Sequence, residues 1–281
     1  MNTSSPLTAQ DAQTAQGEGP AFDTSDPRAV RLAIRAGRFT GFTNLVAREY
    51  IQGNLIAVPA AHADAFEAYA RANSQALPLL GRGEPGRRDI PGIAADLDIA
   101  RDTGGYMVFR DGEVVDTPRD ATPWWRDDLV PFVIGCSFSF EALLQRAGVR
   151  LRHLEEGNVS AMYETDRDTV PVGPFGGKLI VSMRAMSPAD AIAATLLSAR
   201  HPGFHGAPVS LGIPADLGIA DLSHSYGGHG MTVLLPGELP VFWACGATGQ
   251  NAVRAARLPL AITHNKAHMV VTDLPLPKDI A

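Results

Sequence analysis

Two cysteine-containing turns are the segments whose residues could best do chemistry. Cys136 follows an apolar run and precedes a predicted helix, and Cys245 stands between a predicted strand and a predicted helix. The unpaired N–H groups of a helix N-terminus attract anions and lower the pKa of a nearby thiol. Either cysteine could therefore act as a nucleophile or carry a proton, although a lone cysteine is more often a small buried hydrophobe.

Hydroxyl groups accompany both turns. Ser137 and Ser139 follow the first cysteine, and Thr248 lies three residues after the second. Side chains of this type at a helix start hold carboxylates, and they also cap the helix itself. We predict them as substrate-binding residues, with N-capping as the structural alternative.

A histidine and an arginine complete the candidate chemistry. His264 is expected where a strand ends, beside the Cys245 turn if the two strands pair, and its imidazole could serve as a general base. Arg184 ends an apolar strand, where a guanidinium can hold a carboxylate or form a surface ion pair. His264 and His268 have a four-residue spacing, as do His201 and His205. Neither pair is expected on a helix, so no metal site is predicted.

The elements that must position these residues alternate between strands and helices. Helices are predicted at 25–37, 63–73, 138–147, 187–200 and 249–257. Strands are predicted at 50–59, 106–115 (a hairpin around Asp111-Gly112), 150–165, 178–184, 231–235, 241–244, 260–263 and 269–272, and a loop at 80–92. Such alternation favours an α/β fold with a mostly parallel sheet.

The order of the elements suggests two domains. We assign residues 25–148 and 209–281 to a main α/β domain and residues 149–208 to a smaller α+β domain. Residues 1–24 are rich in Ser, Thr, Gln, Ala and Gly and are predicted to be a disordered tail.

Composition limits the partners. The chain has 281 residues and a formal net charge of -6, without a long basic run, so nucleic-acid binding is not expected. No apolar stretch approaches the roughly 20 residues that span a bilayer. Residues 1–24 lack the basic start and the apolar segment of a secretory signal, and the two distant cysteines favour a reducing compartment, so the cytoplasm is the expected location. A small anionic metabolite is the predicted partner, and the oligomeric state is left open, a homo-oligomer included.

The chain resembles a bacterial hydro-lyase family that is related to mammalian D-glutamate cyclase, from about residue 26 to residue 273. The matching segments, all in one order, are 50–55 (YIQGNL), 125–129 (WRDDL), 135–141 (GCSFSFE), 173–184 (GPFGGKLIVSMR), 205–208 (HGAP), 218–222 (GIADL), 240–246 (PVFWACG), 262–264 (ITH) and 268–269 (HM). Two segments depart from the family pattern, namely 225–228 (SYGG), where the family is commonly acidic, and 158–163 (NVSAMY), where it commonly has Asn-Val-Pro-Met-Tyr.

The resemblance implies a three-layer α/β/α domain with a smaller two-layer α+β domain, and a lyase that removes water without a cofactor. The implied substrate is a small hydroxy or amino acid, and D-glutamate cyclised to 5-oxo-D-proline is one candidate. Cys136, Cys245 and His264 are then the predicted catalytic residues, and His205 joins the predicted substrate-binding residues. Two alternatives stay open: a racemase or epimerase that uses the two thiols as opposed acid and base, and a binding domain without catalysis.

Overall fold

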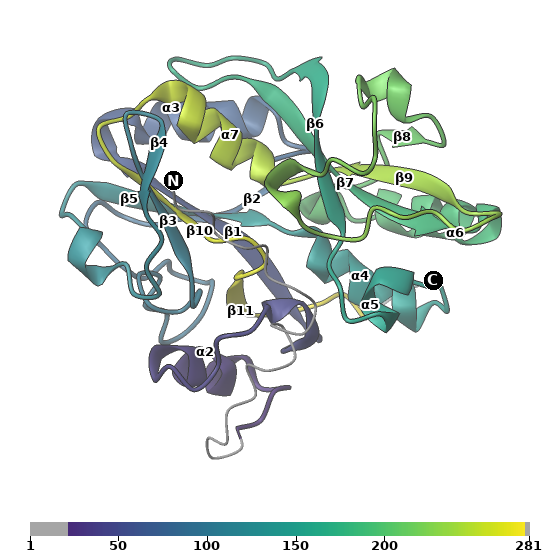
Figure 1. Cartoon of the computed structure of the whole chain (residues 1–281). Helices are drawn as coiled ribbons and strands as arrows, with labels where there is room; N and C mark the ends of the chain where they lie inside the picture. The colour runs from purple at the N-terminus through teal and green to yellow at the C-terminus, as the bar shows by residue number, and fades with distance from the viewer. Residues whose placement is uncertain (1–21, 279–281) are drawn as a thin grey trace, which may run out of the picture.

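The computed structural model describes residues 22–278, so all but the last three residues of the predicted tail lie outside it. Within this range the strands form a seven-stranded sheet, here the large sheet, and a four-stranded sheet, here the small sheet (Figure 1). The helices are α2 (Pro27–Arg35), α3 (Ala60–Ala72), α4 (Ser137–Arg146), α5 (Arg152–Glu155), α6 (Pro188–Ala199) and α7 (Ala247–Ala256). The strands are β1 (Tyr50–Pro59), β2 (Leu79–Arg82), β3 (Tyr106–Arg110), β4 (Glu113–Asp116), β5 (Leu129–Gly135), β6 (Ala161–Asp168), β7 (Lys178–Met186), β8 (Ser210–Leu211), β9 (Leu239–Ala244), β10 (Ala261–His264) and β11 (Val270–Pro275). The fold class is α/β, as predicted.

Two predicted helix starts are confirmed. The Asp26 side chain accepts a hydrogen bond from the backbone N–H of Arg28, and Pro27 occupies the first turn of α2. The Ser187 side chain likewise accepts from the N–H of Asp190 at the start of α6. A polar cap followed by proline satisfies the free N–H groups of a first helical turn, which is why these boundaries can be read locally.

The large sheet is antiparallel, so the expectation of a mostly parallel sheet is wrong. Its strand order is β2-β5-β1-β10-β3-β4, and β11 pairs with the first half of β1. Strand β1 runs antiparallel to β5, β10 and β11. Helix α3 connects β1 to β2, but β5 lies between these strands, and α7 connects β9 of the small sheet to β10 of the large one. The helices therefore do not link neighbouring strands of one sheet, and parallel pairing needs that connection.

The small sheet has the order β6-β7-β9-β8, again antiparallel. Strand β9, which the sequence analysis assigned to the main domain, pairs with β7 of the small sheet. The predicted domain boundaries otherwise stay a prediction. Three local expectations are wrong: 150–165 contains α5 before β6, 231–235 forms only a bridge at Met231, and the predicted loop begins inside β2.

Strand β1, predicted at 50–59, is buried on both faces from Gln52 onward. Ile56 and Val58 pack in one core cluster with residues of α3 and α7, which Figure 1 shows over one face of the large sheet. Leu55 and Ala57 pack in another cluster with Ile90 and other residues of the irregular segment before β3. Because irregular chain supplies much of that second layer, a three-layer α/β/α arrangement is not confirmed.

None of the helices within residues 22–278 is long and apolar enough to cross a membrane.

Candidate functional site

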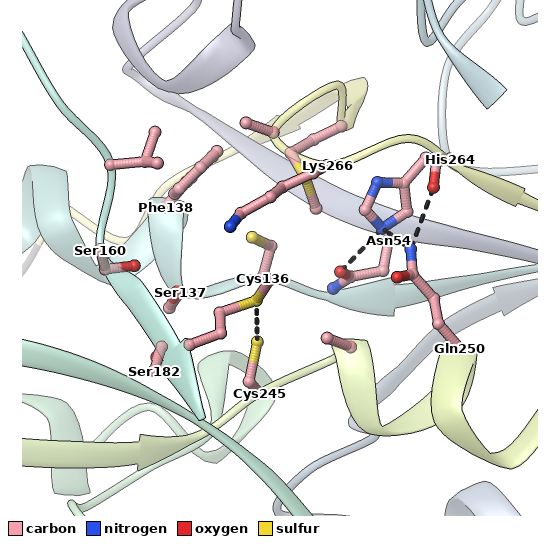
Figure 2. A pocket seen from close by; sticks show the side chains of 15 residues that line it. Asn54, Cys136, Ser137, Phe138, Ser160, Ser182, Cys245, Gln250, His264 and Lys266 are labelled. Atoms are coloured by element: carbon pink, nitrogen blue, oxygen red, sulfur yellow. Dashed lines mark hydrogen bonds between the residues drawn. The ribbon is translucent and has the colours of Figure 1, made fainter. Parts of the chain in front are cut away.

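Three turns that are far apart in the sequence meet around one pocket of about 510 Å³, its open mouth included. They are the β5–α4 turn at Cys136, the β9–α7 turn at Cys245, and the β10–β11 turn after His264, and their convergence is what the sequence analysis expected. Strands β1, β6 and β7 supply further wall, so the pocket lies where the two sheets meet. Figure 2 shows the lining residues Asn54, Cys136, Ser137, Phe138, Ser160, Ser182, Cys245, Gln250, His264 and Lys266.

Both thiols sit at helix N-termini, but they are not acidic. Burial raises the pKa of the Cys136 thiol to about 12, against a smaller opposing effect of the backbone N–H of Phe138. Burial also raises the pKa of the Cys245 thiol, although the N–H of Ala247 opposes it. The expectation of a lowered thiol pKa is therefore wrong, because loss of hydration outweighs the helix terminus. Both cysteines are protonated at neutral pH, and the Cys245 thiol lies 3.7 Å from the Met162 sulfur.

Lys266 supplies the positive charge of the pocket. Its Nζ atom is buried and forms no hydrogen bond to any residue of the described range 22–278. Burial lowers the pKa of the ammonium to about 8. In Figure 2 the side chain extends into the pocket, on the side of Cys136 and Phe138. A lysine at this pKa is mostly charged at pH 7 and still exchanges protons readily, so it can bind an anion or carry a proton.

His264 is an anchored, uncharged ring. Its Nδ1 atom lies 2.7 Å from the backbone oxygen of Asn265, and its Nε2 atom lies 3.0 Å from Asn54 Oδ1 and 3.3 Å from Gln250 Nε2. Burial lowers the pKa of the imidazole to about 4. Because both ring nitrogens have neighbours within the protein, His264 is poorly placed to accept a proton from a substrate.

The Asn54 amide fixes the centre of the site and depends on a glycine. Its Nδ2 atom donates to the backbone oxygen of Gly135 at 2.8 Å, which turns the amide oxygen toward His264. A Cβ atom at Gly246 would lie only 2.2 Å from Asn54 Nδ2. The turn before α7 thus needs glycine so that the amide can lie against its backbone.

Arg184 lies behind the pocket instead of lining it. The guanidinium forms a buried ion pair with Glu141 Oε1, at 3.0 Å from Nε and 2.5 Å from Nη2. Burial acts to raise the pKa of the Glu141 carboxyl, but the charges and hydrogen bonds of Arg184 and His153 outweigh it and lower that pKa to about 2. Arg184 also donates to the hydroxyl oxygens of Ser137 and Ser182, both of which line the pocket. Its positive charge is therefore already neutralised within the protein.

Three other predicted binding residues are engaged with the backbone and do not line the pocket. The Ser139 hydroxyl accepts from the N–H of Gln52, and the Thr248 hydroxyl accepts from the N–H of Ile180. His205 is buried, with Nδ1 2.9 Å from the backbone oxygen of Gln75. Of the predicted site residues, the pocket thus brings together Cys136, Cys245, His264 and Ser137.

The sequence analysis missed Lys266, Asn54, Gln250, Ser160 and Ser182. Lys266 follows His264 by two residues, inside a turn that had already been singled out, so its position was a usable signal. Ser160 belongs to the segment 158–163, which departs from the family pattern. Among the residues that the structure describes, no group of three or more His, Cys, Asp or Glu side chains is arranged to hold a metal ion.

Comparison with known proteins defines the class of this molecule. The family model described as D-glutamate cyclase matches residues 130–273, a range that contains both cysteine turns and the Lys266 turn. The chain therefore belongs to the D-glutamate cyclase family, and it is a lyase of the hydro-lyase type.

Several bacterial proteins similar to this chain carry the name "Putative hydro-lyase". The protein of Methylobacterium radiotolerans is 49% identical over 260 residues, which is 92% of this chain and 95% of that protein. The protein of Bradyrhizobium diazoefficiens is 48% identical over 90% of this chain and 93% of its own length. That of Verminephrobacter eiseniae is 46% identical over 92% and 93%. A solved nitrogen repressor-like protein of Methanococcus jannaschii covers 79% of this chain and 87% of its own, with a TM-score of 0.36 and 9% identity.

Proposed function

We propose that this protein removes water from a small carboxylate substrate, and that D-glutamate, cyclised to 5-oxo-D-proline, is the first substrate to test. The observation that carries the proposal is the Lys266 ammonium, which is buried in the pocket without a partner in the described chain. An unpaired buried charge is costly, and a carboxylate ligand would offset that cost.

The surroundings of Lys266 also suit an anion. Helices α4 and α7 both begin at the pocket wall, and their N-termini carry partial positive charge. The carboxylate of Glu141 lies behind the wall and is neutralised by Arg184. With the thiols of Cys136 and Cys245 protonated, no acidic side chain among the lining residues competes with a bound anion.

The lysine fits the proton transfers of such a cyclisation. The amine nitrogen of D-glutamate would attack the side-chain carboxyl carbon, forming a C–N bond while one C–O bond breaks. The ammonium loses two protons, and both leave on the departing oxygen as water. Lys266, with its pKa lowered to about 8, can donate a proton from its ammonium to the departing oxygen near neutral pH and then, as the amine, accept a proton from the substrate nitrogen. Two such cycles move both protons from nitrogen to oxygen and leave the ammonium restored.

The test is turnover followed by proton NMR. Purified protein is incubated with D-glutamate, L-glutamate and a set of small hydroxy acids, and formation of 5-oxo-D-proline is measured. We expect Lys266→Met to abolish turnover and Lys178→Met, which changes a half-exposed lysine paired with Asp168 in β6, to retain it. Binding of these acids without any dehydration or cyclisation would refute the proposal and favour a binding domain without catalysis.

The two-thiol racemase gains no support from the site. Its acid and base would both need to ionise readily, whereas burial raises the pKa of Cys136 and of Cys245. A Cys245→Ser variant that racemises at the full wild-type rate would exclude it. The cytoplasmic location expected from the sequence stays a prediction.

A further inference from the structure

The Arg184 guanidinium has N–H groups that its ion pair with Glu141 does not use. The residue is only 1% exposed, and its guanidinium packs against two neighbouring aromatic rings, with the guanidinium carbon 4.8 Å from the centre of the Phe140 ring and 5.3 Å from that of Trp243. This packing holds the planar group in one orientation. Nη1 and Nη2 then point toward the pocket wall, where each donates to a serine.

The two serine oxygens are 2.9 Å from the guanidinium, Ser182 from Nη1 and Ser137 from Nη2. A guanidinium can only donate, so both serine oxygens must accept. The hydroxyl hydrogens consequently point away from Arg184. Within residues 22–278 neither hydroxyl donates to a protein acceptor, and both residues line the pocket (Figure 2).

We infer that Arg184 is a positioning residue that fixes Ser137 and Ser182 as a pair of hydrogen-bond donors for the substrate carboxylate. The inference rests on the proposed function, since it assumes that the ligand is a carboxylate. A carboxylate oxygen only accepts, so it matches two oriented hydroxyl hydrogens. A carboxamide presents an NH₂ group on one side and leaves one hydroxyl hydrogen without an acceptor. The site therefore selects the acid over its amide.

Ser160 provides a matched control. It is buried and lines the same pocket, but it does not accept a hydrogen bond from Arg184, whose serine partners are Ser137 and Ser182. Its hydroxyl is free to rotate, so it can accept as well as donate. Removing the Ser160 hydroxyl is expected to weaken binding of the acid and of its amide equally. Removing the hydroxyl of Ser137 or Ser182, which Arg184 orients as a donor, is expected to weaken binding of the acid more than binding of the amide.

The experiment measures binding of glutarate and of its diamide by NMR titration. Neither ligand has an amine, so neither can undergo the proposed lactam formation, and the binding measurement does not depend on that reaction. For Ser137→Ala and for Ser182→Ala we expect the ratio of the two dissociation constants to shift against glutarate by about tenfold, and for Ser160→Ala by less than about twofold. Arg184→Lys, which keeps a cation opposite Glu141, should shift the ratio as the two serine variants do.

The ratio is insensitive to the fraction of folded protein, because unfolded chains bind neither ligand. A ratio that stays constant in Ser137→Ala and Ser182→Ala overturns the inference, as does an equal shift in Ser160→Ala or a wild-type protein that does not bind glutarate. Selective glutarate binding by a protein that turns over no substrate would refute the proposed function while leaving the donor pair in place.

Discussion

Lys266 is expected to destabilise the folded protein in the absence of ligand. Burial lowers the pKa of its ammonium to about 8, whereas an unfolded chain holds a lysine at a pKa of about 10.4. At about 1.4 kcal/mol per pH unit, this difference corresponds to roughly 3 kcal/mol at pH 7. Lys266→Met fills similar space without a charge, so the variant should have a free energy of unfolding larger by up to that amount.

The sign of the pH dependence follows from the lowered pKa. The folded protein binds the Lys266 proton more weakly than the unfolded chain does, so the destabilisation is complete below a pH of about 8 and disappears as the pH rises toward about 10.4. The stability difference between Lys266→Met and wild type should therefore shrink over this range. Thiol ionisation also affects stability there, but both proteins share Cys136 and Cys245, so that contribution largely cancels.

Urea unfolding followed by circular dichroism, at several pH values from 7 to 10, measures this difference. Lys178→Met is the control, because Lys178 is part of an exposed ion pair and should change stability by less than about 1 kcal/mol, with little dependence on pH. The reasoning is refuted if Lys266→Met is less stable than wild type at pH 7, or if the difference between them does not vary with pH.

Three further outcomes follow from the site. Glu141→Gln should lower the free energy of unfolding by about 3–5 kcal/mol, since it leaves the Arg184 cation buried without its counter-charge. Because the pKa of Glu141 is lowered to about 2, the wild-type protein should lose this stabilisation as the pH falls from about 4.3 toward 2. Urea unfolding at each pH measures both effects. Gly246→Ala should weaken glutarate binding and destabilise the protein by about 1–3 kcal/mol, because the new methyl group displaces Asn54; unchanged binding in a titration would contradict this. At pH 7, iodoacetamide should modify Cys136 at least about 100-fold more slowly in the folded protein than in the urea-unfolded protein, as measured by mass spectrometry. Comparable rates in the two states would contradict the raised pKa of the Cys136 thiol.

The parts of the fold that could be predicted are those fixed by local chemistry. The cap at Asp26-Pro27, the cap at Ser187 and the hairpin at Asp111-Gly112 each depend on a few consecutive residues. Sheet direction depends instead on which strands become neighbours. Strand β5 lies between β1 and β2, although 46 residues separate the end of β2 at Arg82 from the start of β5 at Leu129. No local pattern encodes that insertion.

The candidate site likewise has parts that local sequence could predict and parts that it could not. The three turns could be found because each follows a strand and carries a chemically capable side chain. The role of Arg184 could not be found, because its counter-charge, Glu141, is 43 positions away and lies on another element. The prediction of a lowered thiol pKa was wrong for a related reason. A helix N-terminus can be recognised in the sequence, whereas the burial that raises the pKa of Cys136 is a property of the assembled fold.

The two cations at the site are arranged in opposite ways, and the contrast explains why an anion should bind. Arg184 contacts the Glu141 carboxylate, two serines and two aromatic rings. It therefore orients its neighbours, and its ion pair with Glu141 has no net charge that would attract an anion. Lys266 is buried with no partner in the described chain, and the protein bears the energetic cost of holding it there. A fold selected only for stability would pair or expose that lysine. This contrast supports the proposal that the substrate carboxylate pairs with the Lys266 ammonium and accepts hydrogen bonds from Ser137 and Ser182.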